Sequence, residues 1–226
     1  MLIVCGSGRS GTSAVARMLH CSGISVGHDL IEADEHNAEG YFEERKVVLI
    51  NDAILRAVEM HRWFVTASRA EIIAAAQQYR SYMDEAVIEA TAAWKDPRFC
   101  WTLEPWLEVL PERPRVVVCL RSPAEVVAST MRYYGLDEDE PRRAVEHTWR
   151  GEYERLLEII DEYGLDAISV EFGALYAEPE AEAATLSRFV GRPLDASLVR
   201  RDLRHHAMEI QPDLAELYAR VAALGR

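Results

Sequence analysis

The sequence predicts an α/β protein of three layers, with helices on both faces of a central parallel sheet. Two observations support this class. The run RVVVCL at Arg115–Leu120 is β-branched and apolar at both odd and even positions, which is typical of a strand covered on both faces. In addition, short strand-like runs alternate with helical patterns along the chain, as they do in α/β domains.

The expected elements follow from local patterns. In KVVLINDAILRAV the apolar residues recur at three- and four-residue spacing, as on one face of a helix. Strands are expected at Leu2–Cys5, Ile24–Val26, Ala92–Lys95, Arg115–Leu120 and Ala167–Phe172. Helices are expected at Gly11–Cys21, Arg45–Met60, Ala70–Thr91, Pro123–Tyr134, Glu140–Tyr163 and Glu180–Val190.

Length and charge narrow the classes of protein to consider. A chain of 226 residues without repeats or linkers is expected to form one domain, residues 1–226. Its net charge of −13 argues against broad binding to nucleic acid or anionic membranes, which requires basic surfaces. All basic side chains except Lys46 and Lys95 are arginines or histidines, and arginine suits forked contacts to phosphate or sulfate.

The four cysteines show no metal-ligand or CxxC spacing, and Cys5 and Cys119 lie in apolar runs. A thiol in that setting behaves as a small buried hydrophobe. We therefore expect a reduced, cytoplasmic protein. No basic segment precedes the short apolar run Leu2–Cys5, and no apolar stretch reaches membrane-spanning length, so neither a signal peptide nor an integral membrane segment is expected.

The stretch GSGRSGTS after the first strand predicts a phosphate-binding loop. Gly6, Gly8 and Gly11 permit a tight turn whose backbone N–H groups point inward, and a helix N-terminus follows directly. Thr12 stands where a nucleotide triphosphatase carries its lysine, which argues against ATP or GTP hydrolysis. The alternative is a glycine-rich turn with an ordinary Ser/Thr helix cap.

A second candidate site follows the buried strand Arg115–Leu120. Arg121 stands at the strand's end, where parallel sheets bind ligands. Ser122-Pro123-Ala124-Glu125 has the pattern of a capping box with proline at the first helical position, so we assign these residues a structural role. Ser129 lies eight residues after Arg121, about two helical turns on, and by itself is better explained as a small helical serine than as a functional residue.

Together these stretches resemble the sulfotransferase family. Arg9-Ser10-Gly11-Thr12 is similar to the family's 5′-phosphosulfate loop, and Arg121-x-Pro123 with Ser129 is similar to its 3′-phosphate motif. VEFGALYAEPEAEAATLSRFVGRPL resembles the family's C-terminal strand-and-helix segment, and GYFEERKVVLINDAIL and KDPR resemble a bacterial branch. The resemblance extends from Leu2 to about Leu194 and implies a P-loop NTPase-like sulfotransferase fold.

The resemblance implies transfer of a sulfuryl group from 3′-phosphoadenosine-5′-phosphosulfate to a hydroxyl or amine, leaving 3′,5′-adenosine bisphosphate and requiring no metal. Phe172 replaces a tyrosine associated with the adenine, and the family's C-terminal Arg-Lys-Gly loop is absent; whether Arg200, Arg201 and Arg204 substitute for it is open. The residues expected to bind the donor are Ser7, Gly8, Arg9, Ser10, Gly11, Thr12, Ser13, Arg121, Ser129 and Phe172.

For catalysis, the family pattern points to Arg9 as the cation beside the bridging oxygen, where charge develops. An acceptor also needs a general base, for which Glu43 is the first candidate and Glu39 and His36 follow. Lys95 and Asp96 stand where cytosolic members place their catalytic histidine, so both are catalytic candidates. Asp96 equally suits a structural turn before the next helix.

The acceptor itself is left open: a small molecule, a glycan or a lipid. The helical region at about 60–91 and the charged segment at about 132–143 are possible caps over the acceptor, although the latter equally suits a solvated loop. The oligomeric state is undetermined. Two other functions are weighed: a P-loop small-molecule kinase or phosphotransferase, and a non-catalytic protein that binds the donor or its bisphosphate product.

Overall fold

A sheet of four parallel strands lies at the centre of the computed structural model, which describes residues 1–35, 37–61, 66–199 and 210–225. The strand order is β2-β1-β3-β4. These strands are β1 (Leu2–Cys5), β2 (Ala93–Lys95), β3 (Arg115–Leu120) and β4 (Ala167–Glu171). All are almost entirely buried, which explains why their sequences are apolar on both faces.

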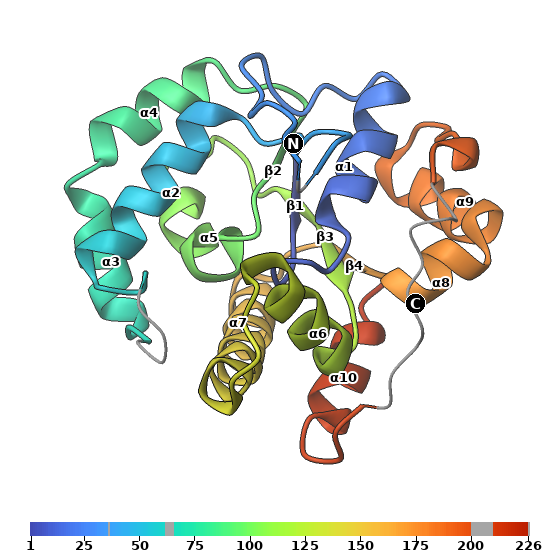
Figure 1. Ribbon diagram of the computed structural model, residues 1–226. Helices are drawn as coiled ribbons and strands as arrows, with labels where there is room; N and C mark the ends of the chain where they lie inside the picture. The colour runs from blue at the N-terminus through green and yellow to red at the C-terminus, as the bar shows by residue number, and fades with distance from the viewer. Residues whose placement is uncertain (36, 62–65, 200–209, 226) are drawn as a thin grey trace.

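The helices form a layer on each side of this sheet (Figure 1). One layer contains α1 (Thr12–Cys21), α8 (Phe172–Ala177) and α9 (Pro179–Val190). The other contains α2 (Arg45–Ala57), α3 (Arg69–Gln77), α4 (Arg80–Ile88), α5 (Phe99–Leu107), α6 (Pro123–Tyr134), α7 (Asp139–Tyr163) and α10 (Ala215–Ala222). A short 3₁₀ helix covers Ala196–Leu198.

Two hydrophobic cores separate the layers, and alternation along the strands supplies both. Leu2 and Val4 of β1 face the core that α1, α8 and α9 complete, whereas Ile3 and Cys5 face the larger core under α2–α7. The predicted three-layer fold with a central parallel sheet is therefore confirmed. Among the described residues, no helix is long and apolar enough to cross a membrane.

Several expected elements differ. Ile24–Val26 forms no strand; instead the Ser25 carbonyl accepts a hydrogen bond of 2.9 Å from the Ala93 N–H at the start of β2. The expected helix 70–91 is two helices that meet at Gln78 and Tyr79. The fully buried helix α5 went unpredicted because FCWTLEPWL has no polar face and contains Pro105. Helices α8 and α10 were also unforeseen.

Candidate functional site

The loop between β1 and α1 has the geometry of a phosphate-binding turn. Gly6 has a φ of 135°, and a Cβ there would lie 2.1 Å from the carbonyl oxygen of Cys119 on β3. Gly11 caps α1 with a φ of 87°, and its Cβ would lie 2.8 Å from the Phe172 ring. Both positions therefore require glycine, and the loop is held against β3 and Phe172.

Tyr153 of α7 fixes the start of this loop. Its hydroxyl accepts a hydrogen bond from the Ser7 backbone N–H (3.2 Å), donates one to the Cys119 carbonyl (2.6 Å) and lies 3.4 Å from the Ser10 hydroxyl. Burial raises the pKa of this phenol well above its usual range, so the group stays neutral. No local pattern predicts this contact, because Tyr153 lies more than a hundred residues from the loop.

Arg121 lies at the end of β3, as expected, and is buried. Its Nη1 donates to the Arg9 carbonyl (3.0 Å), its Nε donates to Glu125 (3.0 Å), and its guanidinium stacks 4.0 Å from the Phe172 ring centroid. The predicted capping box is wrong: Pro123 does take the first helical position, but the Ser122 side chain makes no cap hydrogen bond. Glu125 instead forms an ion pair with Arg121.

Arg9 connects the loop to helix α6. It has a φ of 67°, a left-handed conformation that is uncommon for a residue with a side chain and tends to occur at functional sites. Its Nε donates to the Ser129 hydroxyl (3.2 Å), and its guanidinium lies 5.0 Å from the Tyr133 ring centroid. The structure thus brings together three of the side chains predicted to contact phosphates, Arg9, Arg121 and Ser129.

Lys95 is the charged residue on the other side of the loop. It ends β2 and is 2% exposed. Its ammonium donates to the Ser13 hydroxyl (3.2 Å) and the Tyr41 carbonyl (3.1 Å), and it forms a short ion pair with Glu43. Glu43 also lies 3.9 Å from the Arg98 guanidinium. Two of the expected catalytic residues, Lys95 and Glu43, are therefore joined to each other and to the predicted donor loop.

The other candidate bases are differently placed. Asp96 is fully buried, and its carboxylate accepts hydrogen bonds from the Asn51 side chain and from the backbone and side chain of Arg98, all at 2.9 Å. These contacts position the turn before α5. Glu39 lies 3.4 Å from the Arg17 guanidinium. His36 lies outside the described residues, as does the Arg200–His206 stretch.

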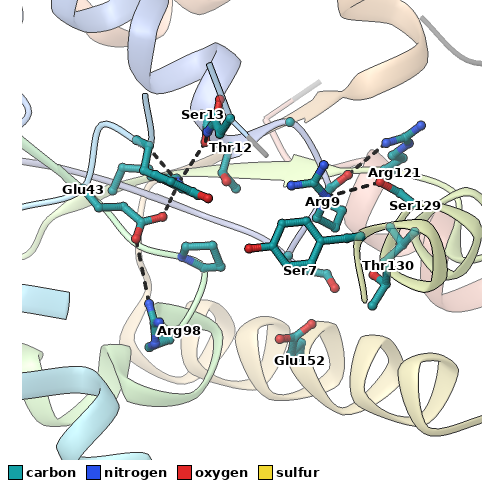
Figure 2. Close-up of a pocket in the computed structure, with 18 of the residues that line it drawn as sticks. Ser7, Arg9, Thr12, Ser13, Glu43, Arg98, Arg121, Ser129, Thr130 and Glu152 are labelled. Carbon is teal, nitrogen blue, oxygen red and sulfur yellow. Dashed lines mark hydrogen bonds and ion pairs between the residues drawn. The ribbon is translucent and has the colours of Figure 1, made fainter. Parts of the chain in front are cut away.

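The β1–α1 loop, Arg121, Lys95 and Glu43 surround a cavity of about 850 Å³ at the carboxyl ends of β1, β2 and β3. Figure 2 shows Glu43 and Ser13 on one side of it, Arg9, Arg121 and Ser129 on the other, and Glu152 below Ser7. Ser10 and Asp96 do not line the cavity. The predicted residues that do are Ser7, Gly8, Arg9, Gly11, Thr12, Ser13, Glu39, Glu43, Lys95, Arg121, Ser129 and Phe172.

Both regions expected to cap the cavity reach it. Met60, His61 and Thr66 line it from the 60–91 region. In the 132–143 segment, only residues 135–138 lie between helices, because α6 runs to Tyr134 and α7 begins at Asp139. Tyr133 and Tyr134, at the end of α6, line the cavity. Whether either region closes over an acceptor stays a prediction.

Glu152 of α7 is a cavity residue that sequence reasoning missed. It is 8% exposed, and burial raises the pKa of its carboxyl to about 7, although hydrogen bonds from the Ser7 and Trp101 side chains partly oppose the rise. Among the described residues its Oε2 atom has no hydrogen-bond partner. The sequence pattern of the helix expected at Glu140–Tyr163 does not distinguish this glutamate from the other charged residues around it.

Comparison with known proteins assigns the family. The model of the sulfotransferase family matches residues 2–196. The chain belongs to this family. The match covers most of the chain and supports the transfer of sulfuryl groups as the general chemistry of the cavity. A search of curated proteins found no match.

Solved sulfotransferase structures share the fold. The sulfotransferase domain from the Synechococcus PCC 7002 olefin synthase has a TM-score of 0.54 and 18% identity, over 99% of this chain and 90% of that domain. Sulfotransferase STF9 from Mycobacterium avium has a TM-score of 0.52 and 15% identity, over 92% and 69%. The sulfotransferase domain from the curacin biosynthetic pathway has a TM-score of 0.51 and 16% identity, over 100% and 91%.

Proposed function

We propose that this sulfotransferase takes its sulfuryl group from 3′-phosphoadenosine-5′-phosphosulfate and transfers it to a hydroxyl or amine of a small molecule, glycan or lipid. The observation that carries the proposal is the joining of two anion sites in one cavity. The β1–α1 loop offers backbone N–H groups to a 5′-phosphosulfate. Arg121, which donates to a carbonyl of that loop, and Ser129, which accepts from Arg9, supply a separate site for a 3′-phosphate.

Each part of the donor has a fitting partner. Ser7, Gly8, Gly11, Thr12 and Ser13, which line the cavity, belong to the loop and the start of α1 that would hold the 5′ end. Phe172, packed under the Arg121 guanidinium, offers an aromatic face near the adenosine. A side chain at Gly11 would collide with the Phe172 ring, so this aromatic face is packed directly against the loop.

Transfer requires cations where charge develops. As the S–O bond to the 5′-phosphate breaks, its electron pair moves to the bridging oxygen, and a fixed positive charge there lowers the barrier. We assign this role to Arg9, which belongs to the loop, with Lys95 as a second cation beside Ser13. Arginine keeps its proton under all ordinary conditions, so its contribution is electrostatic. Glu43 holds Lys95 in place through their ion pair.

Calorimetry separates this proposal from the kinase alternative. We expect 3′,5′-adenosine bisphosphate to bind tightly in the presence of a metal chelator, whereas Mg·ATP binds weakly or not at all. Arg121→Ala should weaken bisphosphate binding about 10- to 100-fold, the usual value of hydrogen bonds to a charged group. Arg132→Ala, which removes an exposed arginine of the same helix, is the matched control and should bind normally. Binding of Mg·ATP alone would contradict the proposal.

A second experiment tests the non-catalytic alternative. Donor labelled with sulfur-35 is incubated with the protein and a fractionated metabolite, glycan and lipid mixture. We expect label in at least one fraction and stoichiometric release of bisphosphate. Saturating donor binding without transfer to any fraction would favour a binding protein.

A further inference from the structure

The cavity contains a carboxyl group that the proposed function has not used. Glu152 projects from α7 toward the space beneath Ser7, next to the predicted donor loop (Figure 2). Glu152 is more than nine-tenths buried, and it lines the same cavity as Ser7. It is therefore adjacent to the loop that would hold the reacting end of the donor.

Its surroundings are those of a small binding compartment. Trp101 packs closely over α7, because the neighbouring residue is Gly151, where a Cβ would lie 2.7 Å from the indole ring. This packing shields Glu152 from water. The side chains that line the compartment from α5, α6 and α7 are mostly apolar or carry hydroxyl groups: Trp101, Val126, Thr130, Tyr133, Val145 and Thr148.

The other carboxylates near the cavity are already occupied. Glu43 has one oxygen in an ion pair with Lys95 and the other 3.9 Å from the Arg98 guanidinium, so both of its oxygens face positive charge. Asp96 is fully buried in hydrogen bonds to Asn51 and Arg98. Glu39 faces Arg17. Asp52, which also lines the cavity, pairs with Arg56, and Glu35, another lining residue, is exposed. Glu152, in contrast, has one buried carboxylate oxygen that lacks a partner within the described chain.

We propose that Glu152 is the general base of the transfer, and that Glu43 serves instead to position Lys95. This inference rests on the proposed function. The Glu152 carboxylate takes the proton from the acceptor's hydroxyl or amine as the new bond from oxygen or nitrogen to sulfur forms. The S–O bond to the 5′-phosphate breaks at the same time, and its electron pair leaves with the bisphosphate.

The titration behaviour of the neighbourhood agrees with this assignment. A base works best when its pKa lies near the working pH, and burial brings the pKa of Glu152 to about 7. The titratable groups next to it are Cys100 of α5 and Tyr153 of α7, and burial raises the pKa of each well above its usual range. Both stay neutral near pH 7, so Glu152 is the group of this cluster that changes charge there.

The test compares Glu152→Gln, Glu43→Gln and the matched control Glu154→Gln, which alters an exposed glutamate of the same helix. Sulfuryl transfer from the donor to water and to 4-nitrophenol is measured as bisphosphate release, between about pH 5 and pH 9. The wild-type rate should rise with pH and level off above about pH 7. Glu152→Gln should lose at least about 100-fold in rate, together with this inflection, while its bisphosphate affinity stays unchanged.

Other outcomes separate the two claims. If bisphosphate fails to bind the wild-type protein, the proposed function is wrong. If it binds, but Glu152→Gln keeps the rate and the inflection, or Glu43→Gln loses the inflection, the assignment of Glu152 is overturned. The variant Glu152→Asp distinguishes a catalytic loss from a folding defect. It keeps a titratable group, so its rate should be reduced but should retain an inflection with pH. A merely structural role would leave the pH profiles of Glu152→Gln and Glu152→Asp like that of the wild type.

Discussion

The buried carboxyl of Glu152 should make folding stability depend on pH in a way that one substitution removes. An unfolded chain exposes this group, whose ordinary pKa is 4.5, while burial raises it to about 7 in the folded protein. Between these values the folded state keeps a proton that the unfolded state releases. Stability from this group is therefore complete below about pH 4.5 and declines as pH rises to about 7.

The size of the effect follows from the two values. Each tenfold difference in proton affinity corresponds to about 1.4 kcal/mol, so the displacement from 4.5 to about 7 amounts to ~3 kcal/mol. Glu152→Gln has no such titration. Its free energy of unfolding relative to wild type should therefore rise by ~3 kcal/mol between about pH 4.5 and pH 8.

Urea denaturation of the two proteins across this range measures the difference directly, and the contributions of the other titrating groups cancel. The matched control is Glu154→Gln, which should show no such trend because Glu154 is exposed. A difference between Glu152→Gln and wild type that stays constant with pH would refute the reasoning. It would mean that Glu152 is ionised in the folded state as readily as in water.

Two further substitutions test the loop and the ion pair. Gly6→Ala should destabilise the protein by about 3 kcal/mol or more in urea denaturation, because its Cβ would collide with the Cys119 carbonyl in a strained conformation. Gly8→Ala, with open space around its Cβ, is the control, and equal stability of the two variants would contradict the close approach. Lys95→Met should cost about 3–5 kcal/mol by leaving Glu43 buried without its cation. Adding Glu43→Gln should recover part of this loss, and a purely additive double variant would argue against coupling.

The sequence was sufficient for the parts of the structure whose signal is local. Glycine spacing after a buried strand identified the loop, since Gly6 and Gly11 are required by backbone conformation and close packing. The resemblance to the family's 3′-phosphate motif singled out Arg121 and Ser129, and the structure places both side chains at the same cavity. Proline at the first helical position likewise placed the start of α6 at Pro123, as observed.

Structural features that depend on contacts between distant residues could not be predicted from local sequence patterns. The capping-box pattern at Ser122–Glu125 was outweighed by the ion pair between Glu125 and Arg121, which a local motif does not reveal. The hydrogen bond between Ser7 and Tyr153 joins residues far apart in the chain, so no periodicity encodes it. Helix α5 was not predicted because it is buried on all sides. Its sequence therefore lacks the polar face by which an amphipathic helix is recognised.

The roles of the two cavity glutamates illustrate why residue type alone does not assign a catalytic function. Glu43 is held in an ion pair with Lys95, close to Arg98, and its oxygens are engaged by positive charge. Glu152 lies against Trp101 and Ser7 with no cation beside it in the described structure, so desolvation alone favours its neutral form. When the environments of two carboxyls differ in this way, the one that exchanges a proton near neutrality is suited to proton transfer, and the paired one is suited to holding a charge in place. The sequence pointed to Glu43 because the stretch GYFE resembles a Gly-Tyr-aromatic-Glu motif in the bacterial branch of the family, whereas the burial of Glu152 exists only once α5 and α7 have packed together.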